Sequence, residues 1–439
     1  MRRVLSGGFL VRGLGAGASV LLNVVVARTM ELDAAGLFLL TISMMLFLSS
    51  VMRFGSDAVT IRLLSGPLSR HADRAEEPPS GPSERPTTAS APRDPSTTFT
   101  TLVVLVLTAF VISTALLAAA AWSFGDAGGD GWGRSPVVWA LPVLTLLYSG
   151  AFSLSSVGLA SGRIVEGLAT RNVVSNLATA VLVGGVALVV APVPLWAAYV
   201  CLAVGLAAAA IVALRRFVRK AGLALTTVRA SDVTGMARFS VPYVLTSFFE
   251  QALLWGGQLA SAALLSTGDI ARLASAQRVA MVLAFGLMVV NSVIAPRFAA
   301  AHDEGLHTRI ARLYQRSLLL SAGIGIPVFV VLFVAARPIM GLFGPAYLEA
   351  SSVLRILLIG QLVNVLTGPA TQRLLMTGRE RIVAVSYGVA AIASFGAFFL
   401  VVPVYGLQGM AVVMAIGLSA HKAVLILTIL RGSVRSNSP

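Results

Sequence analysis

The chain has 439 residues, of which 57% are hydrophobic and only 12% charged, and its mean hydropathy is +0.87. These values exclude an ordinary soluble domain. The formal net charge of +15 would suggest nucleic-acid binding in a soluble protein, but clustered basic tails and aromatic RNA-binding motifs are absent. We therefore predict no nucleic-acid partner and attribute the basic excess to the arginine-rich cytoplasmic loops of a membrane protein.

Twelve apolar segments are each long enough to cross a bilayer as a helix, which takes about 20 residues. Several contain Gly or Pro, which membrane helices tolerate. The predicted fold class is therefore an all-α polytopic membrane protein. The predicted spans are residues 8–28, 34–53, 99–122, 136–158, 172–190, 194–214, 240–264, 276–296, 313–334, 349–370, 382–403 and 408–430.

The connections between these spans alternate in charge. If the N-terminus is cytoplasmic, 25 of the 33 Lys and Arg residues fall on inner connections, five on outer ones and three within spans. Because cytoplasmic loops carry an excess of Lys and Arg, this bias predicts that both termini lie in the cytoplasm. Within the inner set, residues 65–98 are rich in Pro, Ser and Thr and predict a disordered loop. That loop is either a tolerated insertion or a regulatory segment.

Two halves of the chain resemble each other. Asp33-Ala-Ala-Gly precedes the second span, and Asp269-Ile-Ala-Arg precedes the eighth. Ser161-Gly-Arg precedes the fifth span, and Thr377-Gly-Arg precedes the eleventh. We predict an N-terminal six-helix lobe (1–214), a basic cytoplasmic linker (215–239) and a C-terminal six-helix lobe (240–439). Two such lobes with a cavity between them form an alternating-access architecture, which needs no enzyme chemistry.

The sequence gives no support for a catalytic site or a cofactor-binding site. Cys201 is the only cysteine and lies in an apolar run, so there is no disulfide framework and no thiolate metal site. The four histidines are scattered, and no HExxH or Walker motif occurs. We predict that the protein is not an enzyme and binds no cofactor or metal.

Polar residues inside the spans are the candidate site. An ionisable side chain in a span costs about 2.5–3.5 kcal/mol on insertion scales, so it should face a cavity or a partner. Arg12, Gly15, Ser19 and Asn23 share one face of the first span. A similar stripe on the seventh span comprises Tyr243, Ser247, Gln251 and Gln258, with Glu250 as the one carboxylate placed deep in a span.

Further cations lie at other depths. Arg53 ends the second span, Arg278 lies near the outer end of the eighth, Arg355 lies in the tenth and Lys422 in the twelfth. Together with Arg12 they could form a path for an anionic headgroup, since arginine suits phosphate. Each could instead anchor a helix at the interface, snorkel or pair locally. Glu250 is either an ion-coupling carboxylate or a counter-ion for one of these cations.

Longer stretches resemble the bacterial polysaccharide-precursor flippases. The stretches are FLVRGLGAGASVLLNVVVARTMELDAAGLFLL, SVPYVLTSFFEQ, STGDIARLASAQRVAMVL, RPIMGLFGPAYLEASSVLRIL and VPVYGLQGMAVVMAI. The same superfamily holds multidrug and toxin extrusion (MATE) transporters and the peptidoglycan-precursor flippase. The resemblance implies two six-helix lobes around a central cavity. It also implies transfer of undecaprenyl-pyrophosphate-linked oligosaccharide to the outer leaflet of the bacterial cytoplasmic membrane, for polysaccharide biosynthesis.

The resemblance also bears on site residues and partners. Cavity cations in the family's first, second and eighth spans correspond to Arg12, Arg53 and Arg278. Many members carry an acidic residue late in the seventh span, where this chain has Gly256, Gly257 and Gln258, whereas Glu250 lies about two turns earlier. The implied partners are the lipid-linked oligosaccharide, membrane lipids, a polysaccharide polymerase or glycosyltransferases, and H⁺ or Na⁺ as coupling ion.

Two other functions stay open. A cation-coupled multidrug exporter of the same superfamily would favour acidic cavity residues, and Glu250 stands against several cations. A membrane polysaccharide polymerase or ligase would need sizeable external loops with catalytic groups, but the largest predicted outer loop, 123–135, is short.

Overall fold

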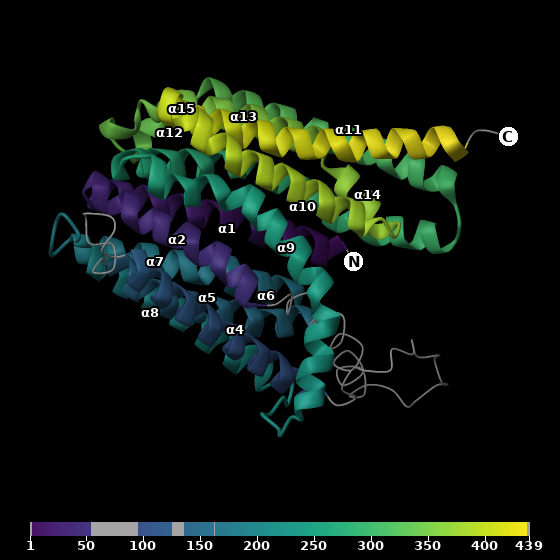
Figure 1. Ribbon diagram of the computed structural model, residues 1–439, viewed down its shortest axis with the longest axis horizontal. Helices are drawn as coiled ribbons and strands as arrows, with labels where there is room; N and C mark the ends of the chain where they lie inside the picture. The colour runs from purple at the N-terminus through teal and green to yellow at the C-terminus, as the bar shows by residue number, and fades with distance from the viewer. Residues whose placement is uncertain (1, 54–94, 125–135, 162, 437–439) are drawn as a thin grey trace. The chain divides into compact units, whose positions relative to one another are not determined.

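The computed structural model describes residues 2–53, 95–124, 136–161 and 163–436, whose course Figure 1 shows. The predicted loop 65–98 lies outside these residues up to residue 94, as does most of the outer loop 123–135. Residues 95–98, predicted as the end of the loop, are helical instead. Pro95 begins that helix, and proline suits a first helical position because its missing N–H would have no partner there.

Every regular element in the described residues is a helix, which confirms the all-α fold class. The first half comprises α1 (Arg2–Thr29), α2 (Leu32–Met52), α4 (Pro95–Phe124), α5 (Pro136–Ala160), α6 (Ile164–Ala169), η2 (Thr170–Val174), α7 (Ser175–Ala187), α8 (Leu195–Ala213) and η3 (Leu214–Val218). The second half comprises α9 (Ala230–Leu264), α10 (Thr267–Asp303), α11 (His307–Val334), α12 (Ala336–Phe343), η4 (Pro345–Tyr347), α13 (Ala350–Thr367), α14 (Pro369–Met376) and α15 (Glu380–Ser436).

Each of the twelve predicted spans overlaps a helix. Nine helices of the described residues are long and apolar enough to cross a membrane, and one of them, within α15, covers both of the last two predicted spans. The tenth predicted span is divided, because α13 ends at Thr367 and Pro369 begins α14. The eight-residue α12 was not predicted, since it is too short to give a hydropathy signal.

By contacts the described chain forms two compact units. Unit 1 comprises residues 1–18, 44–186 and 196–248, and unit 2 comprises residues 19–43, 187–195 and 249–439. Helices α1 and α2 thus contribute residues to both units. The predicted lobes are defined instead by the sequence repeat, and they stay a prediction.

Unit 1 is held together by close helix contacts at small residues. A Cβ added at Gly205 would lie 2.4 Å from Thr179 Oγ1, so α8 approaches the backbone of α7 closely. A Cβ at Gly158 would lie 2.9 Å from the Phe217 ring, which places η3 against α5. Small residues of this kind let membrane helices pack through van der Waals contact, where lipid offers no hydrophobic driving force.

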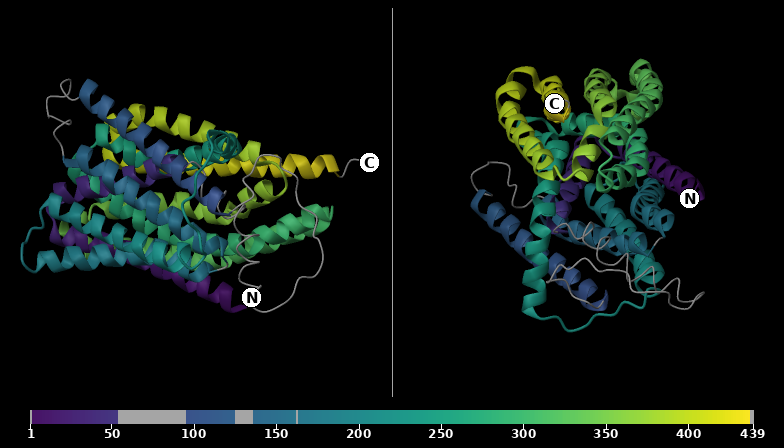
Figure 2. Two further views of the ribbon diagram at one scale, coloured as in Figure 1. Left: turned by 90° about the horizontal axis from the view of Figure 1, so that it is seen from below. Right: turned by 90° about the vertical axis from the view of Figure 1, so that its right-hand side faces the viewer.

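Unit 2 is organised around α13, which packs against α10, α11 and α15. Gly360 makes the α15 contact possible, because a Cβ there would lie 2.7 Å from the Cα atom of Ala415. Helix α15 is broken at Gly406, whose φ of 54° and ψ of −138° are non-helical. The chain turns back there, so the two arms of α15 run side by side (Figures 1 and 2).

Candidate functional site

The first cluster of polar residues lies in unit 1, around Phe152 of α5. The guanidinium carbon of Arg53 lies 3.9 Å from the centroid of the Phe152 ring and 5.9 Å from that of Tyr148. Arg53 is 8% exposed and donates a hydrogen bond of 2.9 Å from Nη1 to Ser49 Oγ, one turn earlier in α2. The predicted cavity cation is therefore a fixed, buried side chain stacked on an aromatic face.

Arg171 lies on the same ring, and sequence reasoning had assigned it to an inner loop. Its guanidinium carbon lies 4.0 Å from the Phe152 centroid. Arg171 belongs to η2, a single π-helical turn between α6 and α7. Such turns are rare within α-helices and occur often at functional sites. The π-turn changes the angular position of Arg171, so no 3.6-residue periodicity indicates where it points.

The N-terminal helix approaches the same turn. A Cβ at Gly15 would lie 2.8 Å from the Cβ atom of Asn172, so α1 packs directly on η2. Arg12 lies three residues earlier on α1 and is half-buried. Gly13 and Gly17 have nothing within 4 Å of an added Cβ, so close helix packing involves Gly15 alone among these three glycines. Unit 1 thus holds two guanidiniums, those of Arg53 and Arg171, against one ring. Arg12 lies on α1, the helix that packs on η2.

The second cluster lies in unit 2 and contains both ions predicted there. Lys422 on the second arm of α15 is 4% exposed and donates a hydrogen bond of 2.7 Å from Nζ to Thr371 Oγ1 of α14. Glu250 of α9 interacts electrostatically with Lys422 and accepts a hydrogen bond from the hydroxyl of Tyr387. The Glu250 side chain is itself exposed. An exposed carboxylate beside a buried ammonium can exchange that partner for a small cation.

Two further residues extend this cluster along α15. The imidazole of His421 stacks on the Tyr387 ring, with centroids 3.8 Å apart and an angle of 19° between the ring planes. His421 Nδ1 lies 2.9 Å from Ser386 Oγ. The two arms of α15 are therefore joined through His421, and sequence reasoning missed Tyr387, His421 and Thr371 because their partners lie far away in the chain.

Three other predicted site residues make side-chain contacts within unit 2. The guanidinium of Arg278 lies 4.9 Å from the Trp255 ring centroid. Arg355 donates from Nε to the carbonyl of Phe333 at 3.3 Å, near the C-terminal end of α11, where a cation complements the helix dipole. Gln258 is fully buried and donates from Nε2 to Gln277 Oε1 at 2.9 Å. The contacts of Arg355 and Gln258 support structural roles, so we leave both out of the proposed site.

The remaining predicted residues lie on α1 and α9. Asn23 is 2% exposed and donates from Nδ2 to the carbonyl of Ser19 at 2.7 Å. Ser247, Gln251 and Ser19 are half-buried. Tyr243 lies within α9, but its side chain is outside the described residues.

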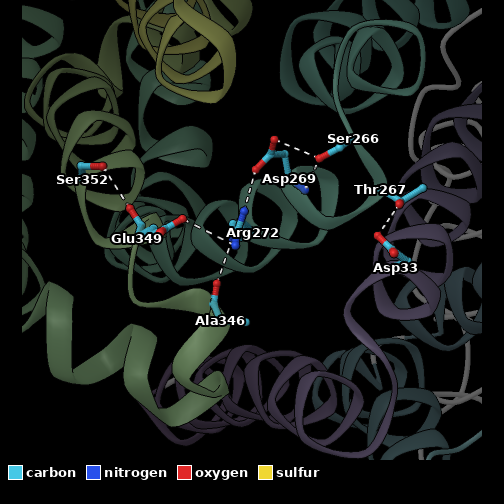
Figure 3. A network of polar contacts seen from close by, with 8 residues as sticks. All are labelled: Asp33, Ser266, Thr267, Asp269, Arg272, Ala346, Glu349 and Ser352. Atoms are coloured by element: carbon cyan, nitrogen blue, oxygen red, sulfur yellow. Dashed lines mark hydrogen bonds and ion pairs between the residues drawn. The ribbon is translucent and has the colours of Figure 1, made fainter.

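A polar network at the starts of α2 and α10 also belongs to unit 2 (Figure 3). Thr267 donates a hydrogen bond to Asp33, and a Cβ at Gly36 would lie 1.9 Å from the carbonyl oxygen of Thr267. Ser266 caps α10, since its Oγ accepts from the Asp269 N–H at 3.2 Å. Both aspartates of the sequence repeat thus occupy the first turn of a helix, where a negative charge is favourable.

Arg272 is the centre of this network, as Figure 3 shows. Its Nη1 atom lies 2.9 Å from Asp269 Oδ1, its Nη2 atom lies 3.5 Å from Glu349 Oε2, and its Nε donates to the carbonyl of Ala346 at 2.8 Å. Tyr347 is buried beside it, and burial raises the pKa of its hydroxyl to about 12, although the charge of Arg272 acts in the opposite direction. This network fastens α10 to the α12–α13 connection.

In the residues that the structure describes, no group of three or more His, Cys, Asp or Glu side chains could hold a metal ion. Both clusters consist of charged side chains and hydrogen bonds that can hold a charged ligand.

Comparison with known proteins identifies the fold. The MatE family model matches residues 242–399. An inward-facing multidrug resistance MATE family transporter of the MOP superfamily superposes with a TM-score of 0.69 at 15% identity, over 98% of this chain and 100% of that chain. The chain has the MATE transporter fold. No curated protein sequence matches it significantly.

Two other structures with this fold differ in what they are reported to do. A MOP superfamily transporter from Pyrococcus furiosus, for which reverse polarity of the binding pocket suggests a different function, gives a TM-score of 0.65 at 13% identity over 99% of this chain and 96% of that chain. The lipid II flippase MurJ, in an inward closed conformation, gives a TM-score of 0.58 at 12% identity, over 97% of this chain and 87% of that chain. The fold therefore accommodates more than one class of cargo, and the side chains must decide among them.

Proposed function

We propose that this protein is an exporter that moves an anionic, lipid-linked oligosaccharide across the bacterial cytoplasmic membrane by alternating access. The cargo we propose is undecaprenyl-pyrophosphate-linked oligosaccharide for cell-surface polysaccharide. The observation that carries the proposal is the pair of guanidiniums, Arg53 and Arg171, that lie 3.9 and 4.0 Å from the centroid of one ring. Two positive charges held against one ring attract an anion and repel a cation.

The chemistry of these side chains suits a pyrophosphate in particular. A guanidinium presents its donors in a planar fork that matches two phosphate oxygens, and the contact with Phe152 holds that fork in place. Stacking also reduces the number of rotamers each arginine can adopt. Less conformational entropy is therefore lost when an anion binds. Arg12, on the helix that packs on η2, is the third cation we assign to this site.

The cluster in unit 2 supplies the coupling in this proposal. Glu250 is exposed and has two protein partners, Lys422 and Tyr387. A proton or Na⁺ that binds Glu250 competes with Lys422 for the carboxylate, which weakens the interaction between α9 and the second arm of α15. The proton or Na⁺ therefore has different affinities for the state in which Glu250 interacts with Lys422 and the state in which it does not. Coupling requires such a difference.

The sequence supports the orientation and the two-lobe organisation of the proposal. The bias of 25 inner to five outer cations favours cytoplasmic termini. The repeated aspartates, Asp33 and Asp269, both lie in the first turn of a helix. These features support lobes at 1–214 and 240–439 joined by the linker 215–239.

A second candidate is a cation-coupled multidrug exporter. Glu250 favours it, since an exposed carboxylate in a span could bind a cationic drug. The structure at TM-score 0.69 is also a multidrug resistance transporter. The cations of unit 1 argue against it, because they would repel such a cargo.

The test uses the purified protein in proteoliposomes. We expect transfer of a fluorescent undecaprenyl-pyrophosphate oligosaccharide between leaflets, detected with a membrane-impermeant sugar oxidant, and no ion-driven transport of ethidium. Arg12→Ala should abolish the transfer while the amount of folded protein persists. Ethidium transport without oligosaccharide transfer would replace the first candidate by the second.

A further inference from the structure

The two arms of α15 enclose a crevice that the proposed transport does not use. Its volume is about 440 Å³, and its lining comes entirely from the two arms, between Arg381 and Ala393 on the first and between Ala420 and Val424 on the second. This volume lies in the range of small-molecule sites, which is about 300–1,000 Å³. The break at Gly406 brings the arms together and so creates the crevice.

The walls of the crevice are apolar and exposed. Val385, Val389 and Val424 are 58%, 64% and 46% exposed, and all three belong to a helix long and apolar enough to cross a membrane. Exposed valines in such a segment meet lipid hydrocarbon rather than water. The crevice therefore admits a hydrocarbon chain from the bilayer.

The floor of the crevice is polar, with Ser386 and His421 side by side. Ser386 Oγ lies 2.9 Å from the carbonyl oxygen of Val383 and 2.9 Å from His421 Nδ1. In the tautomer that we assign, the hydroxyl donates to Val383 and its oxygen accepts from Nδ1. A neutral imidazole has one N–H, so Nε2 is then an acceptor. Nε2 is buried and has no hydrogen-bond partner among the described residues. An unsatisfied buried acceptor is costly, so a ligand that donates a hydrogen bond there is favoured.

The mouth of the crevice carries a positive charge. Arg381 is exposed in the first turn of α15, five residues before Ser386, which corresponds to about 7.5 Å along a helix. A phosphate at Arg381 would therefore lie a few ångströms from a hydroxyl at the floor. The hydrocarbon chain of such a ligand would continue along Val389 and Ala393.

We propose that the crevice binds a monoacyl glycerophospholipid from the bilayer. Its phosphate pairs with Arg381, its free glycerol hydroxyl donates to His421 Nε2, and its single acyl chain lies between the arms. Nε2 is buried, so the floor of the crevice must open when the hydroxyl binds. The crevice lies beside the unit-2 cluster, because His421 stacks on Tyr387, but it does not bind the transported cargo.

Binding of oleoyl lysophosphatidic acid to the full chain in detergent tests the proposal by native mass spectrometry. We expect saturable binding of one molecule. Ala420→Phe, which fills the crevice, should weaken binding at least tenfold. The matched control Ala423→Phe, three residues along the same exposed helix and outside the lining, should bind as wild type does. Arg381→Gln should weaken binding, whereas Arg379→Gln should not. Equal binding by the Ala420→Phe and wild-type proteins would overturn the proposal.

The role of His421 has its own control. An analogue without the glycerol hydroxyl should bind the wild-type protein about fivefold more weakly, the effect of one hydrogen bond. His421→Phe, which keeps an aromatic ring against Tyr387, should bind both compounds equally. If His421→Phe does not fold, the affinities of the two compounds for the wild-type protein still test the role of His421. Equal affinities would overturn the hydrogen bond from the glycerol hydroxyl to Nε2.

Discussion

The guanidinium of Arg171 lies 4.0 Å from the centroid of the Phe152 ring. Arg53 lies 3.9 Å from the same centroid. The two arginines come from η2 and from the end of α2, and only Arg53 was a candidate from the sequence. Their convergence on one ring gives unit 1 its cationic character. Cargo of negative charge is the simplest ligand for such a pair.

Arg171→Gln tests the anion site directly. The variant keeps a hydrogen-bonding side chain but removes the charge, and we expect transfer of lipid-linked oligosaccharide to fall by about 10- to 100-fold, the effect of one charge-assisted hydrogen bond. Arg171→Lys should recover only part of the rate, because it lacks the planar fork. Arg215→Gln in the other π-helical turn, η3, is the matched control, since Arg215 is exposed. Equal rates for Arg171→Gln and the control would remove Arg171 from the site.

Glu250→Gln tests the coupling. The amide binds neither a proton nor Na⁺ as the carboxylate does, so transport should lose its dependence on an ion gradient. Initial rates with and without the gradient measure this dependence. Glu304→Gln serves as the control, because Glu304 forms an exposed pair with Arg309 at 2.8 Å, and exposed pairs contribute little. A gradient response that survives in Glu250→Gln would show that another group couples the ion.

Gly36→Ala tests the contact between α2 and α10. The added methyl group would lie 1.9 Å from the carbonyl oxygen of Thr267, so the backbone must shift, and we expect a loss of about 1–3 kcal/mol in the free energy of unfolding. Thermal unfolding in detergent measures the loss. Gly17→Ala, on an open face of α1, should leave the unfolding temperature unchanged or raise it slightly. The contact would be refuted by equal unfolding temperatures for Gly36→Ala and Gly17→Ala.

Arg355→Gln separates a structural role from a transport role. Arg355 donates to the carbonyl of Phe333, so its loss should lower the free energy of unfolding by about 0.3–1 kcal/mol, the worth of a cation at a helix C-terminus. The transport rate per folded molecule should not change. A variant with normal stability and a strongly reduced rate would return Arg355 to the cationic path predicted from the sequence.

The spans could be predicted from the sequence, because about 20 apolar residues can satisfy their backbone in lipid only as a helix. Helix ends could not, since a helix continues into water without a change in its hydrogen bonds. For this reason α9 begins at Ala230, ten residues before the predicted span. The break at Gly406 falls in the predicted connection between the last two spans, where the sequence had already placed a turn.

The candidate site was only partly predictable. Polarity within a span indicated Arg53, Glu250 and Lys422, because an ionisable group there needs a partner. It could not indicate which partner. Thr371 lies 51 residues from Lys422 and beyond the end of a predicted span. The sequence placed Arg171 in an inner loop, because the periodicity of an α-helix does not reveal the π-helical turn that contains it.

A transport assay with two labelled substrates distinguishes an anionic lipid-linked oligosaccharide from a cationic drug as the cargo. Proteoliposomes containing the wild-type protein receive both the fluorescent undecaprenyl-pyrophosphate oligosaccharide and ethidium, and the transfer of each is followed under the same ion gradient. We predict that the oligosaccharide changes leaflet, that Arg171→Gln slows this transfer at least tenfold, and that ethidium is not transported. Transport of ethidium while the oligosaccharide stays in its original leaflet would show that the cargo is a cationic drug instead.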